Sequence, residues 1–136
     1  GCIEIPVALL GEKLSSCEMQ ADTYRFAITI GRLVEAGELY EFRQLAAVGS
    51  SGTLSIWYGK LEPGPEANKN KCTLERELDR QDYDVPSGRE EIPLVGCFRA
   101  EAGNNAVFVK QEKTWWGSYI GRGFHLCRGC PTGTAP

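Results

Sequence analysis

The chain has 136 residues, of which 42% are hydrophobic and 24% are charged. These fractions are close to those of ordinary globular proteins, so we expect a packed core and exclude a disordered chain. The 18 acidic and 15 basic residues leave a net charge of −3, which argues against sequence-independent nucleic-acid binding. No apolar run approaches the roughly 20 residues that span a bilayer. The sequence therefore predicts a monomer with one domain, 1–136, and no membrane segment.

The chain contains six cysteines spread from end to end, a usage typical of secreted proteins in which disulfides persist. A zinc site is the rival interpretation, because Cys127 and Cys130 have C-x-x-C spacing. There is no second such pair, however, and His125 is the only histidine. We therefore expect a secreted and already processed protein with disulfides, no metal and no cofactor. The cysteines expected in disulfides are Cys2, Cys17, Cys72, Cys97, Cys127 and Cys130.

The best helical pattern in the chain lies before Gly37. Apolar residues recur there at i, i+4, i+7 and i+8, which is one stripe of an amphipathic helix. Asp22 or Thr23 can cap the first turn, and Gly37 can end the last one. This pattern predicts an α-helix over 22–36. The residues of the stripe are Phe26, Ile30, Leu33 and Val34.

After the helix the pattern changes to short segments rich in aromatic and β-branched residues, bounded by Gly, Ser, Asn or Pro. The connections after Val48 and after Ala102 contain Gly and Asn, which tolerate positive φ. These segments predict antiparallel strands and their turns. The predicted strands are 39–48, 52–58, 92–99, 106–110, 115–120 and 124–127.

The segment 62–91 has little apolar periodicity and carries a dense mixed-charge stretch. It is predicted to be a charged loop inserted on the surface, within which 73–80 forms either a short exposed helix or a solvated loop. Cys72 would tie this loop down, with Cys97 as its most economical partner.

Several aromatic and charged side chains are candidate binding residues. Trp115 and Trp116 are neighbours in a predicted strand, which places one indole on each face of the sheet. One of them is expected in the core, and the other on the surface as an anchor for a partner. Tyr83 in the charged loop and Arg122 complete the predicted binding set.

The order of the motifs resembles that of the small guanyl-specific ribonucleases secreted by fungi and of the ribonuclease-like effectors of plant-pathogenic fungi. The resemblance covers residues 17–127 and implies an α+β fold in which one N-terminal α-helix lies on an antiparallel β-sheet stabilised by disulfides. The motifs are Cys17 before the helix, Tyr-x-aromatic at 40–42, Glu-aliphatic-Pro-aliphatic at 91–94, Val-Phe at 107–108 and Phe-x-x-Cys at 124–127.

The resemblance also identifies the positions of catalytic residues. Tyr40 and Glu91 match the family's tyrosine and glutamate, but Phe42 replaces the first histidine and two asparagines replace the arginine. The position of the family's second histidine falls near Arg122, and His125 does not coincide with that position. A site without a general acid or a phosphate-stabilising cation loses several orders of magnitude in rate, because each contributes roughly 10²–10⁴-fold. No catalytic residue is therefore expected.

By this resemblance the chain is a secreted fungal effector, a virulence or avirulence protein that acts without catalysis. It would bind a host plant protein, an immune receptor or an RNA, outside the host cell or after translocation into it. Two alternatives stay open. One is an active guanyl-preferring ribonuclease that uses Tyr40, Glu91, Arg122 and His125, and the other is an antimicrobial or toxin-like protein. The acidic pI of about 5.3 counts against a membrane-active toxin.

Overall fold

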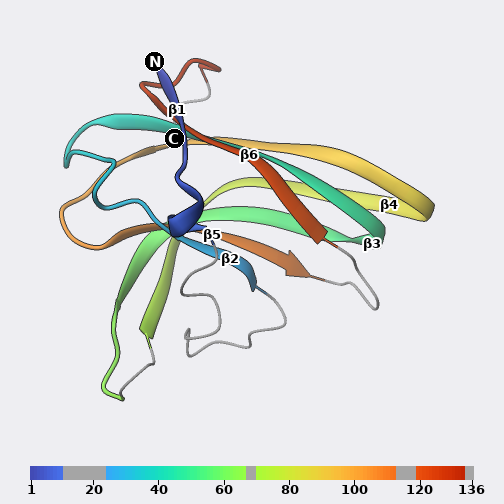
Figure 1. Cartoon of the computed structure of the whole chain (residues 1–136), viewed down its shortest axis with the longest axis horizontal. Coiled ribbons are helices and arrows are strands. Elements are labelled where there is room, and N and C mark those ends of the chain that lie inside the picture. The colour runs from blue at the N-terminus through green and yellow to red at the C-terminus, as the bar shows by residue number, and fades with distance from the viewer. Residues whose placement is uncertain (11–23, 67–69, 113–118, 134–136) are drawn as a thin grey trace.

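The computed structural model describes residues 1–10, 24–66, 70–112 and 119–133, and most of them lie in β-strands (Figure 1). One short 3₁₀ helix, η1, spans Val7–Leu9. The strands are β1 Cys2–Glu4, β2 Tyr24–Thr29, β3 Leu39–Pro63, β4 Asn70–Arg99, β5 Asn105–Glu112 and β6 Tyr119–Arg128.

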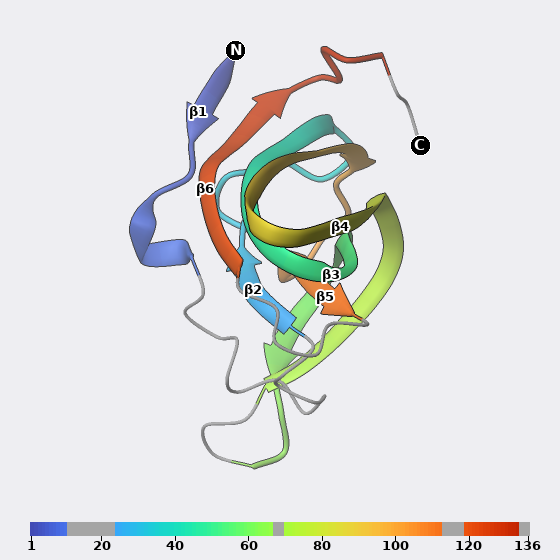
Figure 2. The same ribbon diagram turned by 90° about the vertical axis from the view of Figure 1, so that its right-hand side faces the viewer.

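All six strands belong to one antiparallel sheet with β3 at its centre. On one side, β4 pairs with β3 along its whole length. On the other side, β6 pairs with the first half of β3 and β5 with the second half. The edges of the sheet are formed by β1 on β6 and β2 on β5. Figure 2 shows that β3 and β4 curl together, so that the sheet encloses its own interior.

The core lies inside this curl and is built by the period-two alternation of the strands. Every second side chain of β3 faces it, and strands β2, β4, β5 and β6 add apolar side chains to the same cluster. The ring of Tyr58 stacks on that of Phe98, with 4.7 Å between the centroids, and joins β3 to β4. Fully buried aliphatic and aromatic side chains each contribute about 1.5–3 kcal/mol. Those of β3 are Phe42, Val48, Leu54, Ile56 and Tyr58.

The curl brings two distant parts of β4 together at Gly96. A Cβ atom on Gly96 would lie 2.6 Å from the Cβ of Leu78 and 2.7 Å from its carbonyl oxygen. Next to this contact, the backbone N–H of Val95 donates a hydrogen bond of 3.0 Å to the carboxylate of Asp79. Glycine is therefore required at position 96, since any side chain would push the two segments of β4 apart.

Disulfide bonds join the ends of the chain to the sheet. Cys2 on β1 is bonded to Cys127 on β6, and Cys97 at the end of β4 is bonded to Cys130. Cys72 is disulfide-bonded as well, whereas Cys17 lies outside the described residues. The pairing of Cys72 with Cys97, expected as the most economical one, is wrong because Cys97 bonds to Cys130.

The helix predicted over 22–36 is wrong. Its first residues lie outside the described part of the chain, residues 24–29 form β2, and residues 30–38 form turns. Three of the four residues of the apolar stripe fit a strand as well as a helix, because positions i, i+4 and i+8 lie on one face of either element. Ile28 and Ile30 accordingly enter the same core cluster from alternate positions. The predicted α+β fold class is therefore wrong as well. Of that prediction, the antiparallel sheet and the disulfides are confirmed.

The charged loop predicted over 62–91 is also wrong in most of its length. Residues 70–91 belong to β4, and most of them pair with β3. The strand is not recognisable in the sequence because its charged residues alternate with half-buried positions and form ion pairs on the surface. Arg80 and Glu77 form one such pair at 2.7 Å. The expectation of a single domain stays a prediction.

We expect Gly96→Ala to lower the free energy of unfolding by about 1–3 kcal/mol, the usual cost of overpacking. Denaturant unfolding measures this. Gly31→Ala is the matched control, because its Cβ would meet atoms only at 3.7 Å and beyond, which is ordinary contact. Equal stability of Gly96→Ala and the parent chain would contradict the close approach within β4.

Candidate functional site

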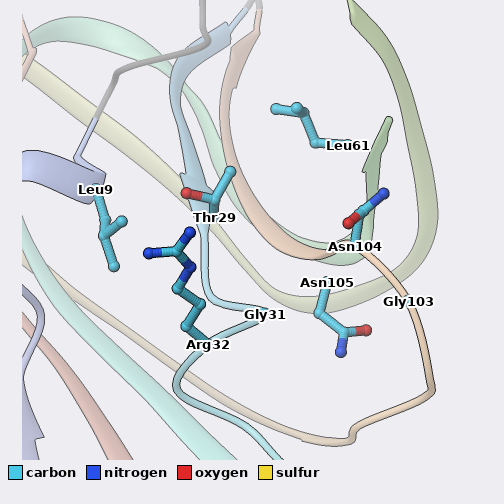
Figure 3. A pocket seen from close by; sticks show the side chains of 8 residues that line it. All are labelled: Leu9, Thr29, Gly31, Arg32, Leu61, Gly103, Asn104 and Asn105. Carbon is cyan, nitrogen blue, oxygen red and sulfur yellow. The ribbon is translucent and has the colours of Figure 1, made fainter. Parts of the chain in front are cut away.

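A cavity of about 570 Å³ lies where the ends of β2 and β3 meet the turn before β5 (Figure 3). Residue Leu9 of η1 borders it on one side. Leu61 of β3 contributes an apolar wall and belongs to a small cluster on the outer face of the sheet. The lining residues are Leu9, Thr29, Gly31, Arg32, Leu61, Gly103, Asn104 and Asn105.

Backbone hydrogen bonds fix the position of the turn at 103–105. The N–H of Ile30 donates to the carbonyl of Asn105, and the N–H of Leu61 donates to that of Asn104, both at 3.0 Å. Gly103 has φ +107°, a conformation that L side chains rarely adopt. The turn is thereby held between β2 and β3, and three of the lining residues, Thr29, Leu61 and Asn105, belong to strands.

The floor of the cavity is a buried hydrogen-bond network around Asn105, which is 3% exposed. Its side-chain oxygen accepts hydrogen bonds from the Tyr58 hydroxyl and, at 2.7 Å, from the Lys60 ammonium group. Its amide nitrogen donates to the carbonyl of Glu101 at 2.8 Å. Lys60 also donates to the carbonyl of Ala102 at 2.8 Å. Because these groups satisfy one another, the floor is set before any ligand arrives.

The groups left for a ligand are on the rim. Arg32 and Asn104 are exposed and Thr29 is half-buried. None of their side chains forms a hydrogen bond or ion pair within the described residues. In Figure 3 the guanidinium group of Arg32 extends between Leu9 and Thr29, and the amide of Asn104 lies on the side of Leu61. The cavity thus offers amide, hydroxyl and guanidinium groups beside two leucine side chains.

The residues expected around a scissile phosphate do not form one constellation. Tyr40 lies in the core, where its hydroxyl accepts a hydrogen bond of 2.7 Å from the backbone N–H of Glu35. Glu91 and Arg122 do lie together, on neighbours of β3, with 2.7 Å between Nε and the carboxylate. His125 is half-buried, and its Nδ1 lies 2.8 Å from the carbonyl oxygen of Gly123. The structure therefore brings together only the Glu91–Arg122 pair.

Of the predicted binding residues, the two that the structure describes, Tyr83 and Arg122, do not line the cavity. Tyr83 is buried, and its hydroxyl accepts a hydrogen bond of 2.5 Å from Gln111. Arg122 is engaged with Glu91, while Trp115 and Trp116 lie outside the described residues. Sequence reasoning missed the cavity because it assigned the residues before Gly37 to a helix. The Gly-Asn-Asn bend at 103–105 was the one signal available for it.

One further group of donor atoms consists of Glu41, Cys97 and Cys130, which lie within 4.8 Å of one another. Because the two cysteines form a disulfide, only the carboxylate could bind a metal, and the group is no metal site. Burial would raise the pKa of Glu41, but hydrogen bonds from the Thr132 backbone N–H and from Arg43 outweigh it and lower the pKa. Glu41 thus anchors the C-terminal segment.

No family model and no curated protein sequence matches the chain. Solved structures do. The Clostridium thermocellum endo-1,4-beta-D-xylanase 10B, in its CBM22-1–GH10 modules complexed with xylohexaose, matches 82% of this chain with 13% identity and a TM-score of 0.56. At this identity the likeness shows the fold alone, which is the nearly all-β fold already described. The chain spans only 20% of the length of that protein.

A second match is the CBM22-1 xylan-binding domain of Paenibacillus barcinonensis Xyn10C, with a TM-score of 0.46 and 12% identity over 76% of this chain and 63% of that one. A CBM4 structure follows at a TM-score of 0.33 and 14% identity, over 76% of this chain and 67% of that one.

The fold overturns the ribonuclease-like resemblance and the effector function drawn from it, because an all-β module contains no helix lying on a sheet. Entry into host cells rests on the same resemblance and loses its basis with it. The disulfides agree with the expected secretion. Within the described ranges, no helix has the length and apolar character needed to cross a bilayer.

We expect Glu41→Gln to lower the free energy of unfolding by about 1–3 kcal/mol at pH 7, because it removes the negative charge and replaces one of the two oxygens that accept hydrogen bonds from Arg43 and Thr132 with a donor. The pKa of Glu41 is lower in the folded than in the unfolded chain, so its contribution is present above the unfolded pKa. It is lost as the pH falls through the folded pKa.

The gap between Glu41→Gln and the parent chain should therefore close as the pH falls below about 4. Denaturant unfolding at pH 7, 5 and 3 measures it, with the exposed Glu38→Gln as control. A gap that stays constant over this range would contradict the role of the ionised carboxylate.

Proposed function

We propose that the chain binds a polysaccharide, with the cavity at the ends of β2 and β3 as the site that holds part of the sugar chain. The observation that carries this proposal is a preformed cavity whose rim side chains have polar groups free for a ligand. Its volume of about 570 Å³ falls within the roughly 300–1,000 Å³ usual for small-ligand pockets. The fold likeness to a xylanase module structure complexed with xylohexaose supports the same class of ligand.

The chemistry of the rim suits a sugar. Each hydroxyl of a sugar both donates and accepts hydrogen bonds, and the amide of Asn104 and the hydroxyl of Thr29 can do the same. The C–H faces of a sugar ring are apolar and would lie against Leu9 and Leu61. Apolar walls with a few placed polar groups are the usual composition of ligand sites.

The floor of the cavity reduces the cost of binding. The network of Asn105, Tyr58 and Lys60 is complete without a ligand, so binding needs no rearrangement of buried groups. Sites that are ordered beforehand lose less conformational entropy when they bind, and this raises affinity for a given set of contacts. Only the rim side chains Arg32 and Asn104 would lose rotamer freedom.

We expect the chain to be retarded in gels that contain soluble xylan, and Asn104→Ala to weaken the affinity about 2- to 10-fold. This is the range for one hydrogen bond of about 0.5–1.5 kcal/mol. Affinity electrophoresis over a series of xylan concentrations gives the dissociation constants. Ser51→Ala is the control, because Ser51 is an exposed residue of β3 that does not line the cavity.

The proposal fails if xylan and a panel of other soluble polysaccharides leave the mobility of the chain unchanged. The assignment to this cavity fails if Asn104→Ala binds as tightly as Ser51→Ala.

A further inference from the structure

Arg32 is the one charged side chain among the residues that line the cavity. It lies three residues after the end of β2, is exposed, and forms neither a hydrogen bond nor an ion pair within the described residues. Figure 3 shows its guanidinium group between the side chains of Leu9 and Thr29. An arginine in such a place has all five of its N–H donors free for a ligand.

A second positive charge lies beneath the rim. The ammonium group of Lys60 is bonded to Asn105, itself a lining residue, and its side chain is only 12% exposed. The carboxylate of Glu101 is 3.8 Å away but is 50% exposed, so solvent screens much of its effect. No carboxylate lines the cavity. The local field in the described part of the site therefore favours an anion.

We propose, resting on the proposed function, that the cavity prefers an acidic saccharide and that Arg32 binds the carboxylate of a uronic acid residue. The planar guanidinium group matches a carboxylate with two parallel hydrogen bonds, a geometry that a single sugar hydroxyl cannot provide. Asn104 and Thr29 then bind the hydroxyls of the same or the next ring. Arg32 is in this way the residue that determines specificity among sugars of similar shape.

The test compares each acidic polysaccharide with its own neutral form. Glucuronoxylan is paired with the same material after carboxyl reduction, and polygalacturonate with its methyl ester. We expect at least one acidic form to bind the parent chain about 10-fold or more tightly than its neutral partner, in affinity electrophoresis and in calorimetry. The preference should shrink as salt is raised from low to physiological ionic strength, because the rim is open to solvent.

Substitutions test whether Arg32 causes the preference for the acidic form. Arg32→Gln should bring the ratio of acidic to neutral affinity close to one, and Arg32→Lys should leave an intermediate ratio because it keeps the charge but not the paired geometry. Arg89→Gln removes the same charge from an exposed position of β4 outside the cavity and should keep the parent ratio. Thermal unfolding checks that each variant is folded.

The outcomes separate this inference from the function on which it rests. Equal affinity for acidic and neutral forms, with binding retained, overturns the inference and leaves polysaccharide binding intact. A preference that survives Arg32→Gln, or that Arg89→Gln removes as well, also overturns it. Binding to neither form of any polysaccharide overturns both.

Discussion

The structure depends on the pairing of β3 with three other strands. Its 25 residues are bonded to β4 along one side and to β6 and then β5 along the other. A strand bonded on both sides along such a length cannot bend without taking its partners with it, so the course of β3 sets the curl of the whole sheet. Because side chains alternate between the two faces of a strand, β3 also supplies the largest buried side chains of the core, among them Phe42 and Tyr58.

The cavity is connected to the hydrophobic core through the side chain of Tyr58. The ring of Tyr58 is fully buried against Phe98, so its hydroxyl must find a partner inside the protein. Asn105 provides that partner and is held in turn by Lys60 and the backbone of Glu101. The network that satisfies a core residue thus also forms the floor of the site. Fold and candidate function share these side chains, and a change in Asn105 would disturb both.

The sequence predicted the parts of the fold that depend on local patterns. Alternating apolar residues located the strand segments within β3, β5 and β6, and the even cysteine count predicted disulfides. Pairing is not a local property, which is why residues 70–91 of β4 were missed although its last part, 92–99, was predicted as a strand. The charged residues of 70–91 form a strand only through hydrogen bonds to β3. The apolar residues Phe26, Ile30 and Val34 fit the period of a strand as well as that of a helix. The cavity combines Arg32 and Asn104, which are far apart in the chain and meet only in the folded sheet.

The availability of Arg32 follows from the arrangement of the charges around it. The carboxylate of Glu101 lies beside Lys60, and that of Glu35, three residues after Arg32, lies 3.5 Å from Arg128. Two of the three acids on the loops next to the cavity therefore face another cation, and the third, Glu38, is exposed. A guanidinium group without a partner is tolerated here because it is exposed and hydrated. A carboxylate that entered the rim would exchange this water for paired hydrogen bonds and need displace no carboxylate of the described residues, whereas a neutral sugar would gain only ordinary ones.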